Sequence, residues 1–173
     1  MGTLAVDNIQ HTDGSSAVTL NNANITDLSA GTIGSGVTFP AGHIIQVKYD
    51  SISTQSSQIN SGSVDSGMSI SITTSGSNNV LLLGALCVNL SNNGGKKVDL
   101  VIKRNGTTIL DTNDYMQGPD TNSSIQQSGS LNYLDTGASG TNVYTIELKA
   151  RTGWCMWNYD GALSTMTAME IAV

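Results

Sequence analysis

The hydrophobic positions divide this chain into a sparse part and a dense part. In the first 39 residues, single apolar side chains are separated by Asn, Thr, Ser and Gly. These apolar positions are Leu4, Val6, Ile9, Val18, Leu20, Ile25 and Leu28. Such a pattern is too thin to close a core within one chain, so it predicts burial against symmetry mates or another protein. We therefore expect an N-terminal attachment or shaft segment over residues 1–39 and a head domain over residues 40–173.

After residue 40 the apolar residues follow the period of β-strands. Met68, Ile70 and Ile72 alternate with hydroxyl side chains, which is typical of a strand with one buried face. Residues 80–90 are apolar on both faces, as in a central strand or a strand at a subunit interface. Further strands are expected at 130–134, 143–148, 154–159 and 163–173. No segment has the apolar spacing of an amphipathic helix.

A hairpin is expected around Asn105-Gly106. This dipeptide separates the apolar runs 98–103 and 107–110, and it suits a type I′ turn, in which both central residues need a positive φ. Turn signals recur about every ten residues, and eight or nine short strands result. The predicted fold is therefore all-β, an antiparallel β-sandwich of the jelly-roll kind.

The polar interval from Asp111 to Gly129 contains Pro119 and little periodicity. Long irregular segments of this kind often carry recognition, so we expect an exposed loop at one end of the sandwich. Within it, Tyr115 and Met116 are candidate contacts for a receptor or another partner. Because surface changes usually cost little, a short Gly-Ser turn is expected to replace the interval at a cost of about 1–2 kcal/mol.

Aromatic residues are concentrated in one short segment, which contains Trp154, Trp157 and Tyr159. Flat amphipathic rings stack on sugars and anchor protein interfaces. In a chain with a single Phe, packing in the core or at a trimer interface is the simpler interpretation of this cluster. The alternative is a contact surface that recognises a host glycan or a neighbouring capsid protein, with these three residues as candidate contacts.

The net charge and the apolar runs of the sequence bear on whether the chain binds nucleic acid or enters a membrane. The net charge is −6, and the only basic runs are Lys96-Lys97 and Lys103-Arg104, which argues against nucleic acid as a partner. The start of the chain lacks the features of a secretory signal, and the longest apolar run is far short of a membrane span. We therefore expect no membrane insertion and assembly in a cytoplasm.

The residues needed for catalysis or metal binding do not come together in the sequence. His11 and His43 have no nucleophile in an elbow motif, and Cys87 and Cys155 have no CxxC partner. Both cysteines are expected to be free thiols, with a disulfide possible only if their strands are neighbours. The segment 111–114 resembles a calcium loop only faintly, because the Gly and the distal Glu are missing. We nominate no catalytic residue, no cofactor and no metal site, although three copies of His43 near a trimer axis would offer an ion ligands.

Several segments resemble, in this order, those of fibre-like virion proteins of tailed bacteriophages. They are the junction at 27–43 and the motifs at 39–47, 64–73, 101–107 and 166–171. The similarity extends over most of the chain, and each motif alone is weakly specific. The resemblance implies a homotrimeric virion protein with an N-terminal attachment segment and a C-terminal β-sandwich head.

The expected function is that of a non-enzymatic phage structural protein, a fibre-type component that attaches to the host surface by receptor binding. The alternative is a capsid decoration protein that stabilises the head shell. In either case its partners are two further copies of itself and other phage structural proteins, either tail components or the major capsid protein, and its location is the virion. A tailspike-type glycan hydrolase is the third possibility, and no acid pair can be nominated for it.

Overall fold

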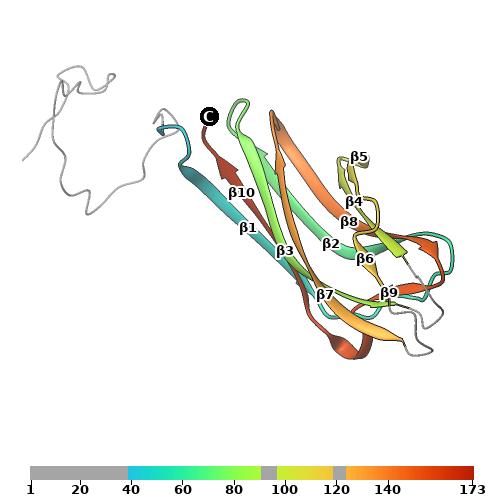
Figure 1. Ribbon diagram of the computed structural model, residues 1–173. Coiled ribbons are helices and arrows are strands. Elements are labelled where there is room, and N and C mark those ends of the chain that lie inside the picture. The colour runs from blue at the N-terminus through green and yellow to red at the C-terminus, as the bar shows by residue number, and fades with distance from the viewer. Residues whose placement is uncertain (1–38, 91–96, 119–123) are drawn as a thin grey trace, which may run out of the picture. The chain divides into compact units, whose positions relative to one another are not determined.

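The computed structural model describes residues 39–90, 97–118 and 124–173, and these form a β-sandwich (Figure 1). The all-β, antiparallel sandwich predicted from the sequence is confirmed. The predicted attachment segment, with its seven apolar positions from Leu4 to Leu28, lies outside the described residues, so the boundary near residue 39 stays a prediction. No helix in the described part of the chain has the length and apolar character needed to cross a membrane.

Two five-stranded sheets make up the sandwich. The first sheet has the order β1-β10-β3-β7, with β9 also paired to β3. Its strands are β1 (Ile44–Ile52), β3 (Asn79–Leu90), β7 (Ile125–Asp135), β9 (Cys155–Trp157) and β10 (Ser164–Ile171). The second sheet has the order β2-β8-β4-β5, with β6 also paired to β4. Its strands are β2 (Gly62–Thr74), β4 (Lys97–Arg104), β5 (Thr107–Asp111), β6 (Met116–Gln117) and β8 (Gly140–Thr152).

The core lies between the sheets and is built by alternation along each strand. Met68, Ile70 and Ile72 of β2 point inward, as their spacing predicts. The other fully buried side chains at the centre include Val80, Leu82, Leu86, Leu100, Ile102, Tyr144, Ile146, Leu148, Trp157 and Met166. β3 has β10 on one side and β7 on the other, in agreement with the central position predicted for 80–90.

The predicted hairpin joins β4 to β5. Asn105 and Gly106 have φ values of 51° and 78°, which are the left-handed conformations that a type I′ turn requires. The side chain of Asn105 adds a tie to the neighbouring strand, because its Oδ1 accepts a hydrogen bond of 2.8 Å from the N–H of Val143. The turn residues therefore fix the register of β4 and β5 and also hold the hairpin against β8.

The long exposed loop predicted for 111–129 is wrong where the structure has strands, at Asp111, 116–117 and 125–129, and its residues 119–123 lie outside the described part of the chain. β5 ends at Asp111, β6 lies at 116–117 and β7 begins at Ile125. Gly129 belongs to β7 and lies beneath the loop side chains, since an added Cβ there would come within 2.2 Å of Met116 Cε. Gln127 and Gly129 occupy inward positions of β7, opposite the core residues Val88 and Leu86, so the alternation of this strand is hidden in the sequence. A Gly-Ser turn would thus remove strand pairing and core contacts, so we expect that replacement to cost more than the ~1–2 kcal/mol inferred from the sequence.

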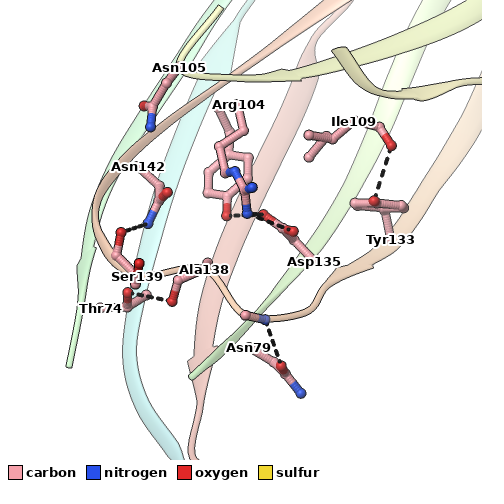
Figure 2. A network of polar contacts seen from close by, with 12 residues as sticks. Thr74, Asn79, Arg104, Asn105, Ile109, Tyr133, Asp135, Ala138, Ser139 and Asn142 are labelled. Atoms are coloured by element: carbon pink, nitrogen blue, oxygen red, sulfur yellow. Dashed lines mark hydrogen bonds and ion pairs between the residues drawn. The ribbon is translucent and has the colours of Figure 1, made fainter. Parts of the chain in front are cut away.

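A charged group crosses the core from one sheet to the other (Figure 2). Arg104 at the end of β4 reaches inward, and its Nη1 donates to both oxygens of Asp135 on β7, at 3.0 and 2.8 Å. Tyr144 of β8 donates to the same carboxylate at 2.7 Å. Burial, followed by the hydrogen bond and the charge of Asp135, raises the pKa of Tyr144. Asp135 is 5% exposed, so its charge is stabilised by these two partners rather than by water.

A second buried carboxylate lies at the other edge of the core. Glu170 of β10 is 0% exposed, and no cationic side chain of the described residues pairs with it. It accepts hydrogen bonds from Gln46 Nε2 at 2.5 Å, Ser75 N at 2.7 Å and Asn78 Nδ2 at 2.8 Å. Burial disfavours its ionised form, but these donors outweigh burial and hold the pKa of Glu170 below its ordinary value. Glu170 thus ties β1 and the β2–β3 turn to β10.

We expect the Asp135→Ala substitution to lower the free energy of unfolding by about 3 kcal/mol, because it leaves the guanidinium of Arg104 and the hydroxyl of Tyr144 without their acceptor. Denaturant unfolding at fixed protein concentration measures the change. Asp111→Ala is the matched control. Asp111 pairs with Lys149 on the outer surface, with both side chains about two-fifths exposed, so its loss should cost less than about 1 kcal/mol. Equal costs for the two variants would contradict this account.

Glu170 should also make stability depend on pH. Its pKa is lower in the folded chain than the ordinary value of 4.5, so its contribution is present above that value and is lost as the pH falls through the folded pKa. The Glu170→Gln variant should be less stable at neutral pH, and its stability should change less between neutral and acid pH than that of the wild type. Glu147→Gln, which changes a carboxylate on the outer surface, controls for the loss of one acid. Parallel pH profiles for wild type and Glu170→Gln would refute the assignment.

Candidate contact surface at the end of the sandwich

A tight turn between β9 and β10 is built on unusual backbone conformations. Asn158 and Asp160 have φ values of 53° and 56°, and they flank the start of the short 3₁₀ helix Tyr159–Gly161. Non-glycine residues rarely adopt this left-handed region, and Asn and Asp tolerate it best. The strand predicted for 154–159 therefore ends at Trp157, where the chain turns instead of continuing.

The buried side chain and backbone of Asn158 anchor the turn to the rest of the sandwich by hydrogen bonds. It is fully buried, and its N–H donates to Cys87 O at 3.0 Å while its Nδ2 donates to Thr54 O at 3.2 Å. Its Oδ1 accepts a hydrogen bond of 2.5 Å from Ser164 Oγ, and Ser164 Oγ in turn accepts from the N–H of Cys87 at 2.8 Å. This network joins β3, β10 and the chain after β1, so the strained turn is fixed on three sides.

The turn presents apolar side chains to the outside. Tyr159 is 45% exposed and Leu163 is 54% exposed. Polar groups surround them, since Gln126 Nε2 donates to Tyr159 O at 3.2 Å and Gln55 Oε1 accepts from Asp160 N at 3.2 Å. An aromatic ring on a fixed backbone loses little entropy on binding, and a surrounding polar rim is typical of a contact surface. We call the exposed surface of Tyr159, Leu163, Asp160, Gln55 and Gln126 the tip.

The tip lies at one end of the sandwich, and the chain enters and leaves the described part at the other (Figure 1). Ile44 at the start of β1 pairs with Ile171, whereas Ile52 at its end pairs with Ser164, next to the tip. β10 has eight residues, so the two ends are separated by about 26 Å of strand.

The other candidate contact residues are less exposed than Tyr159. Trp157 is 0% exposed, and its Nε1 donates to Val64 O at 3.1 Å, so it is a core residue. Met116 is 7% exposed and packs over Gly129. Tyr115 is half-buried and donates to Ser130 O at 2.9 Å, and burial raises its pKa to about 12. Trp154 is half-buried. The structure thus does not bring the five residues together into one surface, and Tyr159 alone belongs to the tip.

Sequence reasoning did not identify Leu163, Gln55 or Gln126 as part of this surface. Leu163 stands directly before β10 and appears in the sequence as one more residue of that strand. Gln55 and Gln126 belong to segments about 70 residues apart. The pairing of β3 with β7 and β9 brings Gln126 to the turn, whereas a hydrogen bond from Ser56 N to Trp157 O holds the segment of Gln55 beside it. No local signal marks either residue.

Many charged side chains of the described residues are joined in ion pairs. Within 39–90, 97–118 and 124–173, no group of three or more His, Cys, Asp or Glu residues could hold a metal ion. Asp111 and Asp114, from the faint calcium motif, pair with Lys149 and Lys97 at 2.7 and 2.6 Å. His43 is exposed, with its ring centroid 6.3 Å from that of Phe39.

The two cysteines are free although they come from paired strands. Cys155 lies in the core, and burial raises its pKa to about 12, which keeps the thiol protonated and unreactive at neutral pH. Cys87 is half-buried, and its Sγ contacts Ser128 Oγ at 3.3 Å and Leu163 O at 3.2 Å. The free thiols expected from the sequence are confirmed.

No protein-family model matches the chain, and no curated protein matches it. Among solved structures, the VP2 subviral particle of infectious bursal disease virus is similar at 17% identity and a TM-score of 0.44, over 86% of this chain and 46% of that one. The chain thus spans about half the length of the VP2 chain. A dimeric latent PorU from Porphyromonas gingivalis has 12% identity and a TM-score of 0.32, over 82% of this chain and 14% of that one. The C-terminal domain of the sugar-binding protein EclA has 12% identity and a TM-score of 0.26, over 87% of this chain and 96% of that one. TM-scores this low do not establish a common fold.

Proposed function

We propose that this chain is a non-enzymatic structural component of a bacteriophage particle, a homotrimeric fibre-type protein that attaches to the host surface through the tip. Residues 1–39 dock it to the particle, and residues 40–173 form the head. The observation that carries this proposal is the tip itself, in which a buried Asn158 fixes an exposed Tyr159 and Leu163. The ordered resemblance of its segments to fibre-like phage proteins supports the same conclusion.

The position of the tip suits attachment. An adhesive protein must present its contact surface away from the point at which it is anchored. The tip lies next to Ser164 at the start of β10, whereas β1, the first strand of the described chain, begins at Ile44 beside Ile171 at the other end of β10. A flat ring beside amide and carboxylate groups is also the combination that binds the faces and hydroxyls of a sugar, so a surface glycan is the receptor class that the tip suits best.

A capsid decoration role is the second candidate. In that role, the tip would contact a neighbouring capsid subunit, because a small apolar centre with a polar rim suits a protein surface as well as a glycan. The two roles place the protein at different sites on the particle and in different numbers.

Copy number distinguishes the two roles. Quantitative densitometry of purified particles should give tens of copies per particle for a tail or head fibre, because fibres occupy a few symmetric positions. A decoration protein covers the shell and should be present in hundreds of copies. We expect the lower number, and a count in the hundreds would replace attachment with decoration.

The tip can be tested directly by adsorption. In particles whose protein carries Tyr159→Ala and Leu163→Ser, adsorption to host cells should be at least about tenfold slower, because a few central side chains carry most of the energy of a small contact. Both side chains are about half exposed, so the melting temperature and incorporation into particles should change little. Val143→Ser, a change at an exposed apolar side chain of the second sheet, is the control and should adsorb like the wild type. Normal adsorption of the tip variant would contradict an attachment role for Tyr159 and Leu163.

A further inference from the structure

A row of apolar side chains crosses the outer face of the first sheet from β1 to β7. The register of the four strands places one residue from each in a single row, namely Val47, Met169, Leu81 and Leu134. Val47 is 53% exposed and Leu134 is 46% exposed, at the two edges of the sheet. The inner faces of the same strands already fill the core, so this row is a second apolar surface with nothing packed on it within the described residues.

The neighbouring rows extend the surface. Ile44, which is 55% exposed, pairs with Ile171 at one end. Tyr49, which is 61% exposed, lies in the same row as Leu83 on the other side. We call these eight side chains the neutral face: Ile44, Val47, Tyr49, Leu81, Leu83, Leu134, Met169 and Ile171. In Figure 1 the strands β1, β10, β3 and β7 that carry it lie side by side in one layer.

The charges of the sandwich are distributed unequally between its two outer faces. In the described strands of the first sheet, the outward positions carry no Asp, Glu, Lys or Arg. The outer face of the second sheet carries a series of ion pairs. They are Lys97 with Asp114, Lys103 with Glu147, Lys149 with Asp111 and Arg151 with Asp99. The outer face of the second sheet thus carries charged groups that keep it solvated, and the outer face of the first sheet lacks them.

We propose that the neutral face is the surface on which copies of this chain meet, and this deepens the proposed homotrimer by naming its interface. Around a symmetry axis, every side chain near the axis faces its own copies, so a charged residue there would lie beside an identical charge. The chain carries a net charge of −6, and its copies repel each other at long range. The face without charges is therefore the one that can be brought against itself.

The size of the neutral face fits this occupant. Its eight side chains expose on the order of 500 Å² of apolar surface, which is near the upper end for the largest patch of a typical monomer. A stable interface buries about 800 Å² per partner. The next row along the strands, which is Ser51, Thr165, Ala85 and Ser130, is uncharged and supplies additional area as a polar rim.

The test is the association of the full chain in solution. Sedimentation equilibrium should give about three times 18.0 kDa for the wild type. The Val47→Lys, Leu134→Lys double variant should dissociate with a constant at least about 100-fold higher, because charges buried between copies lose their water without gaining a partner. The substitutions change the net charge from −6 to −4, which lowers long-range repulsion, so weaker association must come from the face itself.

The matched control is Val143→Lys with Ser69→Lys, which adds the same charge to the outer face of the second sheet and should associate like the wild type. Circular dichroism and melting show whether each variant folds. If the double variant does not fold, the single variant Tyr49→Lys, at the most exposed position of the face, takes its place.

An unchanged dissociation constant in a folded face variant would overturn the neutral face as the interface and leave the homotrimer standing. A monomeric wild type would overturn both and leave the neutral face to another protein, whereas the adsorption test of the tip is independent of either result.

Discussion

Each strand of a sandwich has two faces, and only one of them can be buried between the sheets. The rest of this structure depends on how the second face is used. In the second sheet the outward positions of β4 and β8 carry Lys103, Glu147 and Lys149, which form ion pairs and remain solvated. In the first sheet the same outward positions carry Leu81, Met169 and their neighbours. The two sheets share one core, so folding of the sandwich does not by itself account for the difference between their outer faces.

Elements with a strong local signal could be predicted from the sequence. The alternation of Met68, Ile70 and Ile72, the dense apolar run of β3 and the turn at Asn105-Gly106 each express a backbone preference that needs no distant partner. These signals were sufficient for the all-β antiparallel sandwich. The boundary near residue 39 rests on the same kind of pattern and stays a prediction.

Features that depend on contacts between distant segments could not be predicted. β7 between Ile125 and Gly129 has Gln, Ser and Gly at positions that alternate only weakly, and its pairing with β3 makes it a strand. Tyr115 and Met116 pack over Gly129 because that residue has no side chain. Trp157 and Tyr159 are two residues apart and would share a face of a strand, but the left-handed Asn158 between them sends the first into the core and the second outward.

The same limit applies to the surfaces proposed here. The neutral face exists only after the registers of β1 with β10 and of β10 with β3 are known, because its apolar row is assembled from residues far apart in the chain, such as Val47 and Met169. Glu170, which follows Met169 in β10 and points inward, illustrates the constraint. A one-residue slip of β10 would turn the Glu170 carboxylate outward, away from its donors Gln46 and Asn78, and would turn Met169 into the core. The hydrogen bonds of Glu170 therefore hold the outer face in register as well.

The tip and the neutral face lie on different sides of the sandwich, so contact at one does not cover the other. The neutral face runs along the strands, whereas Tyr159 and Leu163 lie beyond their ends. Copies that meet face to face around an axis parallel to the strands would leave every tip free and pointing the same way. A single tip is small, so one contact is weak. When several tips belong to one rigid assembly, the first contact makes the second one intramolecular, and the overall affinity for a repeated receptor rises. If copies associate through the neutral face, as we propose, the assembly would thus supply the repeated contact that a small adhesive tip needs in order to hold a particle on a surface.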